Sequence, residues 1–307
     1  MRSFLPALLL GLIVSGADAG VARGIHQDGL VPVNGTELYV TRSGNGEPIV
    51  VVHGGPMLEH GYLQPYLAPL SDSFELVFFD QRLSGRSAPT VDPASVRIAT
   101  FVDDIEALRV ALDLGPIHLL GHSWGGLLAM RYGLRYPQNL RSLILVSPMA
   151  ASSDLWLREE GVVAERVSER DRQERDAVGS SEAFADGEPE AIERMLRLSV
   201  RPQFHDPSRL SELQIYVPGD YQDRSAQLGA MGVDLESFDF HDELEDLAVP
   251  TLIIYGSAEP GGPIGGAAIG QRLPDSRMVT IPAAGHFPFI EQPQAFIDAV
   301  REFLAGR

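Results

Sequence analysis

Short apolar runs alternate with longer amphipathic segments over much of this chain, and the alternation predicts its elements. Apolar runs typical of buried β-strands lie at 37–43, 49–53, 76–79, 116–120, 143–146, 251–255 and 278–281. Helical patterns follow at about 97–114, 126–134, 264–273 and 294–304. Strands that alternate with helices predict an α/β fold, a mostly parallel sheet with helices on both faces.

The alternation stops between residues 150 and 247, where charged residues predominate. Oppositely charged residues lie four positions apart there, such as Asp171 and Arg175, which suits a solvent-exposed helix. Of 42 acidic and 24 basic residues in the chain, 24 and 10 lie in 151–246. We therefore expect a core formed by 20–149 and 248–307, with 150–247 inserted as a helical cap.

The first nineteen residues have the pattern of a signal peptide. Arg2 is followed by an apolar run from Phe4 to Val14, and Ala17-Asp18-Ala19 is a cleavage site of the small-x-small type. The run is short for a bilayer span, although an uncleaved anchor is the alternative. We predict cleavage near Ala19, export to the periplasm or the medium, and no stable membrane insertion afterwards.

Composition excludes several kinds of chemistry. The chain has no cysteine, so disulfides, cysteine nucleophiles and thiolate metal sites are excluded. Every basic residue is arginine, which excludes Schiff-base lysines and a P-loop lysine. The net charge of -18 argues against nucleic acid and anionic membranes as partners. No metal-binding motif or dinucleotide-binding loop is evident, so we expect neither a metal nor a cofactor.

The segment Gly121-His122-Ser123-Trp124-Gly125 lies between a predicted strand and a predicted helix. In that context G-x-S-x-G is typical of the sharp turn that exposes a nucleophilic serine above a sheet. The alternative is a glycine-rich turn that only connects two elements. We predict that Ser123 is a nucleophile, which then needs a base and an acid that orients the base.

His286 is the predicted base, because it follows the last strand and so lies at the same edge of the sheet as Ser123. The acid is expected between serine and histidine in the chain. Glu259 follows the strand at 251–255 and is the predicted acid. Alternatively, Glu259 is a solvated loop residue and Asp154 takes this role.

Two backbone amides are predicted to hold the oxyanion of the reaction. One is the N–H of Trp124, directly after the nucleophile, and the other is the N–H of Gly55 in the loop 53–56. Asp80 and Arg82 end another strand on this edge. Either Arg82 binds substrate or, as we favour, the two residues form one structural network that shapes the oxyanion loop.

These residues resemble the α/β-hydrolase superfamily and, within it, the proline iminopeptidase group of serine peptidases. The resemblance covers about 35–150 and 247–305, and it rests on His53-Gly54-Gly55-Pro56, on 80–87, on 121–126 and on Gly285-His286. It implies a triad of Ser123, Glu259 and His286 beneath a helical cap. Met57 and Leu83 stand where the family usually has glycine, and Glu259 stands where aspartate is usual.

The expected function is that of an exported serine hydrolase that works through an acyl-enzyme on a small-peptide or small-molecule substrate. We favour an aminopeptidase that releases N-terminal proline or a similar residue, because the acidic cap suits a free α-ammonium group. No cap segment aligns with the amine-binding acids of the family. The alternatives are an esterase or lactonase for small apolar substrates and a non-catalytic ligand sensor.

Overall fold

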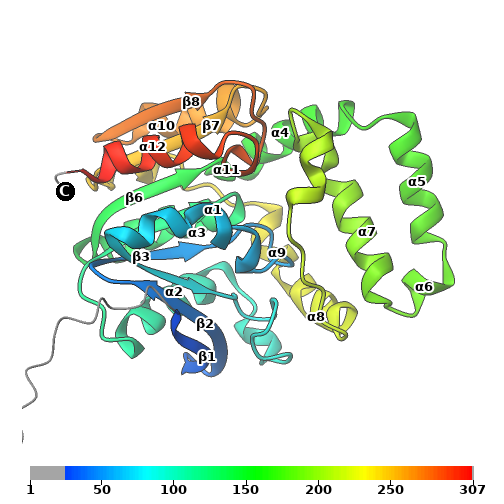
Figure 1. Ribbon diagram of the computed structural model, residues 1–307, viewed down its shortest axis with the longest axis horizontal. Coiled ribbons are helices and arrows are strands. Elements are labelled where there is room, and N and C mark those ends of the chain that lie inside the picture. The colour runs from blue at the N-terminus through cyan, green and yellow to red at the C-terminus, as the bar shows by residue number, and fades with distance from the viewer. Residues whose placement is uncertain (1–24, 306–307) are drawn as a thin grey trace, which may run out of the picture.

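The computed structural model describes residues 25–305 (Figure 1), so the predicted signal peptide at 1–19 lies outside the described residues. Among the helices in this range, none is both long and apolar enough to cross a membrane. The architecture is that of an α/β protein with one central sheet.

Eight strands form the sheet in the order β1-β2-β4-β3-β5-β6-β7-β8. They are β1 Ile25–Val33, β2 Thr36–Gly44, β3 Glu47–Val52, β4 Phe74–Phe79, β5 Ile117–His122, β6 Leu140–Val146, β7 Thr251–Gly256 and β8 Ser276–Ile281. β2 pairs antiparallel with β1 and β4, and the remaining neighbours pair in parallel. The prediction of a mostly parallel sheet is therefore confirmed.

The central strands are buried on both sides because helices cover both faces of the sheet. Every residue of β5 and β7 is buried. In β3, Val50 and Val52 face one hydrophobic cluster and Ile49 and Val51 face the other, as the two-residue period of a strand requires. On the first face lie α2 Ile98–Ala111, α3 Trp124–Arg135 and α10 Ala267–Arg272, and on the second α1 Gln64–Leu67, α11 Pro288–Glu291 and α12 Pro293–Leu304.

The strand β1 is an element that the hydrophobic pattern did not predict. Its sequence, IHQDGLVPV, mixes polar and apolar residues and lies at the edge of the sheet. A tight hairpin joins it to β2 through Asn34 and Gly35, which have φ of 42° and 74°. Asn-Gly is the strongest short signal for such a hairpin, so the turn could have revealed the strand.

Between β6 and β7 the chain forms short helices above the carboxyl edge of the sheet. The α-helices are α4 Ser153–Glu165, α5 Glu169–Gly179, α6 Glu182–Ala185, α7 Pro189–Val200, α8 Tyr221–Leu228 and α9 Gly232–Glu236. Figure 1 shows α5, α6 and α7 at the end of the molecule farthest from the sheet. Ser152, Ser168 and Ser181 cap three of the helices through side-chain bonds to backbone N–H groups. The boundaries 150 and 247 stay a prediction.

Candidate active site

Ser123 lies at the sharp turn between β5 and α3, with φ of 54° and ψ of -120°. Residues other than glycine rarely adopt this backbone conformation, and its strain must be held by neighbouring contacts. The Ser123 N–H donates to the Val146 carbonyl at 3.0 Å, and the Ser123 carbonyl accepts from Gly126 and Met149. The turn thereby fixes the serine at the wall of a cavity.

The two glycines of G-x-S-x-G are required by close backbone packing. A Cβ on Gly121 would lie 2.3 Å from the Gly125 carbonyl oxygen, and one on Gly125 would lie 2.2 Å from the Val52 oxygen. Real side chains do not tolerate such distances. The motif therefore exists because strand, turn and helix approach one another with no room for a side chain.

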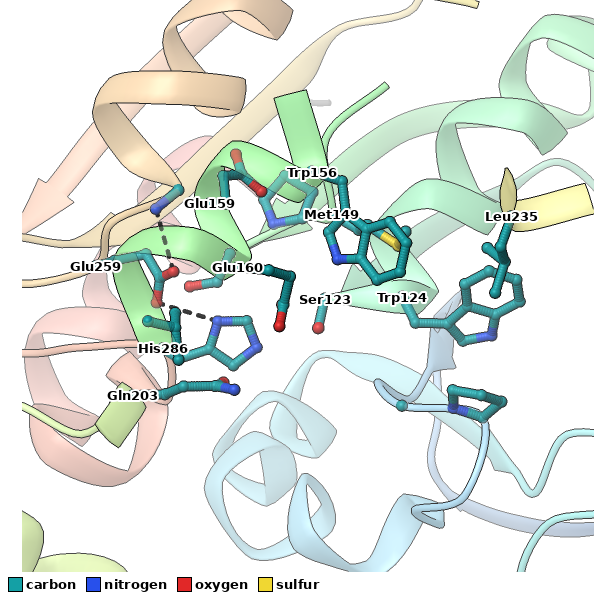
Figure 2. A pocket seen from close by; sticks show the side chains of 16 residues that line it. Ser123, Trp124, Met149, Trp156, Glu159, Glu160, Gln203, Leu235, Glu259 and His286 are labelled. Carbon is teal, nitrogen blue, oxygen red and sulfur yellow. Dashed lines mark hydrogen bonds and ion pairs between the residues drawn. The ribbon is translucent and has the colours of Figure 1, made fainter. Parts of the chain in front are cut away.

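The imidazole of His286 contacts the carboxylate of Glu259. The Nδ1 atom of His286 lies 3.0 Å from Glu259 Oε2, and the other carboxylate oxygen accepts from the Gly261 N–H at 3.3 Å. With its proton on Nδ1, His286 keeps Nε2 free as a base. Asp154, the alternative acid, lies exposed on α4. Figure 2 shows the His286 ring between Glu259 and Ser123.

One cavity of about 200 Å³ brings together all five residues that the sequence singled out: Ser123, His286, Glu259, Gly55 and Trp124. Most of its other walls are apolar, with side chains that include Pro148, Met149, Trp156, Val163 and Leu235. The placement of these residues agrees with the predicted site, and their chemical roles stay predictions.

The loop 53–56, which carries the predicted oxyanion donor Gly55 and is named the oxyanion loop, is held by Gln81, a residue that the sequence did not mark as functional. Gln81 donates from Nε2 to the His53 carbonyl at 2.7 Å, and its Oε1 accepts from Trp124 Nε1 at 2.9 Å. The Gln81 N–H donates to Nε2 of His53, and burial lowers the pKa of His53 to about 4, so this ring is neutral. Gly55, with φ of 44°, lies two residues after His53 in this loop. The position of Gln81 between Asp80 and Arg82, at the end of a predicted strand, was the sequence signal that could have pointed to its structural role.

Asp80 and Arg82 belong to two separate networks, which corrects the expectation of one shared network. Arg82 binds Asp104 on α2 with two hydrogen bonds of 2.6 and 2.7 Å, and both side chains are buried away from the cavity. Asp80 instead accepts from Nδ1 of His60 at 2.6 Å and from the Arg86 N–H at 2.7 Å. The placement of Arg82 therefore fits a structural role and not substrate binding.

Glu59, His60 and Asp80 form a buried group whose potential metal-ligating atoms lie within 4.8 Å of one another. Other groups of the protein already form hydrogen bonds and an ion pair with these side chains. Glu59 accepts from the Gly61 N–H at 2.8 Å, and the Arg86 guanidinium lies 3.4 Å from the same carboxylate. Because a fixed cation is already beside the cluster, we assign no metal ion to it.

Glu159 on α4 is a buried carboxyl group in the same cavity. Its Oε1 accepts from the Gly265 N–H at 2.8 Å. Burial, with Glu259 and Glu160 nearby, raises the pKa of Glu159 to about 8. The charged sequence of this segment predicts a solvated helix, so Glu159 was not among the predicted site residues. The spacing of Trp156, Glu159, Glu160 and Val163 at three and four positions was the signal of one inward helix face.

The fold and the site define a class of protein. The chain matches the family described as alpha/beta hydrolase fold over residues 47–293, and it belongs to that family. It is an enzyme of the serine hydrolase class, as the sequence predicted.

Within the family, the chain is similar to proline iminopeptidases. It is 30% identical over 296 residues to the proline iminopeptidase of Lactiplantibacillus plantarum, covering 90% of this chain and 99% of the relative. The crystal structure of the Mycobacterium smegmatis proline iminopeptidase matches with a TM-score of 0.67 and 24% identity, over 91% and 98% of the two chains. A thermophilic esterase from Thermogutta terrifontis matches with a TM-score of 0.65 and 26% identity, over 92% and 98%.

Proposed function

We propose that this enzyme is an aminopeptidase that releases a small N-terminal residue, with proline preferred, from short peptides. The observation that carries the proposal is that Glu159 and Glu160, both on α4, line the cavity that holds Ser123 and His286. A substrate with a free N-terminal amine needs a carboxylate beside an apolar pocket, and this cavity offers both.

The reaction follows from the placement of the five predicted residues. Ser123 Oγ attacks the carbonyl carbon of the scissile bond while Nε2 of His286 takes the serine proton. Glu259 orients His286 and stabilises its charged form, and the N–H groups of Gly55 and Trp124 bind the oxyanion. His286 then protonates the leaving amine. A water molecule, activated by the same histidine, releases the acid from Ser123.

The size and charge of the cavity favour a small substrate residue with an ammonium group. A volume of about 200 Å³ lies below the roughly 300–1,000 Å³ typical of sites for drug-sized ligands. Glu160 is exposed toward the solvent and Glu159 is buried. A bound ammonium would lower the raised pKa of Glu159, so that this carboxyl ionises when the substrate binds.

The first test is whether Ser123 carries the reaction. Replacing Ser123 with Ala is expected to reduce kcat by about a million-fold, as in other triad enzymes. Thr41→Val is the control and should keep the wild-type kcat, because the Thr41 hydroxyl is also buried, has no hydrogen-bond partner and lies outside the cavity. Near-normal turnover by the Ser123→Ala enzyme would exclude the proposed mechanism.

The second test separates a peptidase from an esterase. We expect prolyl arylamide to be cleaved with a higher kcat/KM than N-acetylprolyl arylamide, short acyl esters or lactones. Glu160→Gln should raise KM for the free-amine substrate by about 10-fold and leave the N-acetylated substrate unchanged, because only the free amine is an ion-pair partner. Preference for acyl esters, with no effect of Glu160→Gln, would favour the esterase alternative, which the apolar walls and the similarity to a solved esterase support.

We also propose that the mature enzyme is exported, on the basis of the sequence pattern at residues 1–19. Fractionation of the producing cells is expected to find a chain that begins near residue 20 outside the cytoplasm. An intact chain that begins with Met1 in the cytoplasm would contradict this proposal.

A further inference from the structure

Tyr62 and His122 form a buried polar pair that the proposed reaction does not use. Tyr62 ends a 3₁₀ turn at His60–Tyr62, and His122 is the last residue of β5, directly before the nucleophile. Their side chains are buried and connect two parts of the site that are far apart in sequence. On one side they reach the oxyanion loop, and on the other they reach the peptide of His286.

Three hydrogen bonds join in series through this pair. The Gly54 N–H donates to the Tyr62 hydroxyl at 2.6 Å, and that hydroxyl lies 2.7 Å from Nδ1 of His122. The Nε2 atom of His122 lies 3.0 Å from the carbonyl oxygen of His286. A backbone carbonyl only accepts, so His122 carries its proton on Nε2, and Nδ1 must accept the proton of Tyr62.

Packing and burial keep this arrangement in one protonation state. Burial lowers the pKa of His122 well below its usual value and raises the pKa of Tyr62, so the imidazole stays neutral and the hydroxyl keeps its proton. The rings of Phe287 and Phe289 lie 5.4 and 5.1 Å from the His122 ring, measured between centroids. A Cβ on Gly54 would lie 2.8 Å from His122 Nδ1, so the loop approaches the pair without a side chain.

The N–H groups of His286 and of the preceding residue, Gly285, are also held. Its N–H donates to the Gln203 carbonyl of the cap at 2.9 Å, and the Gly285 N–H donates to Oε2 of Glu291 at 2.6 Å. With the bond from His122, the backbone of the predicted base is bound from the cap, from α11 and from β5. Of these three contacts, the His122 bond continues to Gly54, next to the oxyanion donor Gly55.

We propose that Tyr62 and His122 are positioning residues that couple the oxyanion loop to the catalytic base. The proposal rests on the roles assigned above to Gly55 and His286, and it does not depend on the preference for proline. The series of bonds fixes the distance between the group that takes the serine proton and the amide that binds the oxyanion. Both must be in place together in the transition state, so the coupling acts on kcat more than on substrate binding.

The test compares Tyr62→Phe with Tyr66→Phe in the full-length enzyme. Tyr66 serves as the control, since its ring also contacts Phe289, while its hydroxyl donates to the Glu212 carbonyl, outside the series. We expect Tyr62→Phe to lower kcat by about 10- to 100-fold with KM changed by less than about twofold, because one oxyanion donor is misplaced without being removed. Tyr66→Phe should behave like the wild type.

Two substitutions of His122 separate the two ends of the series. Asparagine places an acceptor near the position of Nδ1, and glutamine places a donor near the position of Nε2. His122→Asn therefore keeps the bond from Tyr62 and loses the bond to His286, and His122→Gln does the reverse. Because either break uncouples the loop from the base, both variants should lose kcat to a similar extent. The double variant Tyr62→Phe/His122→Gln should lose no more than either single change.

The measurements are kcat and KM on a substrate that the wild type turns over, the rate at which a fluorophosphonate labels Ser123, and the thermal midpoint. If Tyr62→Phe does not fold, the His122 variants carry the test. A folded Tyr62→Phe enzyme with the kcat of Tyr66→Phe would overturn the proposal, and so would losses that add in the double variant. Activity that survives in Ser123→Ala would instead refute the reaction mechanism, independently of the results with the Tyr62 variants.

Discussion

The core around the nucleophile and the outer part of the cap use charged and polar groups in opposite ways. In the core, polar side chains are buried and bonded to one another, as in the pair of Arg82 and Asp104. On α5 of the cap, the pair of Arg170 and Glu174 lies at the surface, where Arg170 is 78% exposed. Buried networks hold one geometry, and surface pairs mainly keep a helix soluble.

The apolar side chains show the same contrast. The buried members of the two hydrophobic clusters of the sheet include Leu244 and, from α8, Leu228, but none from α5 or α7. Of α7, the partly buried Val200 at its end packs against the cluster on the second face. The buried residues Val178, Ile192 and Leu198 belong instead to the part of the cap where α5 and α7 pack on each other. Such a small separate core predicts lower local stability. We infer that the sheet fixes the chemistry, and that the cap selects substrates through the few side chains it directs inward.

The largest expected difference between the two regions is in the cost of breaking an ion pair. Arg82→Met should lower the free energy of unfolding by about 3–5 kcal/mol, because it leaves the buried Asp104 carboxyl without its cation and without two hydrogen bonds. Arg170→Met should lower it by no more than about 0.5 kcal/mol, because Arg170 is 78% exposed. Urea unfolding of both variants measures the difference. The double variant Arg82→Met/Asp104→Leu should recover much of the loss, and equal effects of the two single changes would remove the contrast.

Substitutions of two glycines compare the backbone packing of the core with that of the cap. Gly125→Ala should destabilise the protein by about 3 kcal/mol or more, because the new Cβ would meet the Val52 carbonyl at 2.2 Å. Gly161 in α4 has no atom within 4 Å of an added Cβ, so Gly161→Ala should stabilise by about 0.5–1 kcal/mol. Thermal unfolding measures both. A Gly125→Ala protein with the wild-type midpoint would mean that the turn between β5 and α3 has more room than the structure gives it.

The parts of the molecule that sequence predicts are those that depend on local pattern. The buried strands and the helices α2 and α12 follow from periodicity, and Ser123, Glu259 and His286 follow from the rule that parallel strands end at one edge. These residues indeed line one cavity. Each of these three residues lies in the segment that follows a strand, and the apolar run of that strand is visible in the sequence.

What sequence did not predict depends on contacts between distant segments. His122 is 60 residues from Tyr62 and 164 from the His286 carbonyl that it binds. Gln81 joins the oxyanion loop to Trp124 across separations of 28 and 43 residues. No local periodicity encodes such pairs, and a glutamate in a charged helix, such as Glu159, looks solvated until the opposite wall of the cavity is known.

Glu159 is a buried acid of the cap that lines the cavity of Ser123, and its titration gives the last test of the comparison. Because burial raises its folded pKa to about 8, above the usual 4.5, the unfolded chain holds fewer protons than the native protein between these values. This group therefore makes the native state less stable as the pH rises from about 4.5 to about 8.

Relative to the wild type, Glu159→Gln should gain about 2 kcal/mol of unfolding free energy between pH 5 and pH 7. Glutamine keeps an oxygen that can accept from the Gly265 N–H but has no proton to lose. The exposed Asp154→Asn variant on the same helix controls for the change in net charge. Urea unfolding at both pH values gives the difference. If the two variants shift in parallel, the Glu159 carboxyl is as well hydrated as the rest of the cap surface, and the cap directs no buried acid toward the nucleophile.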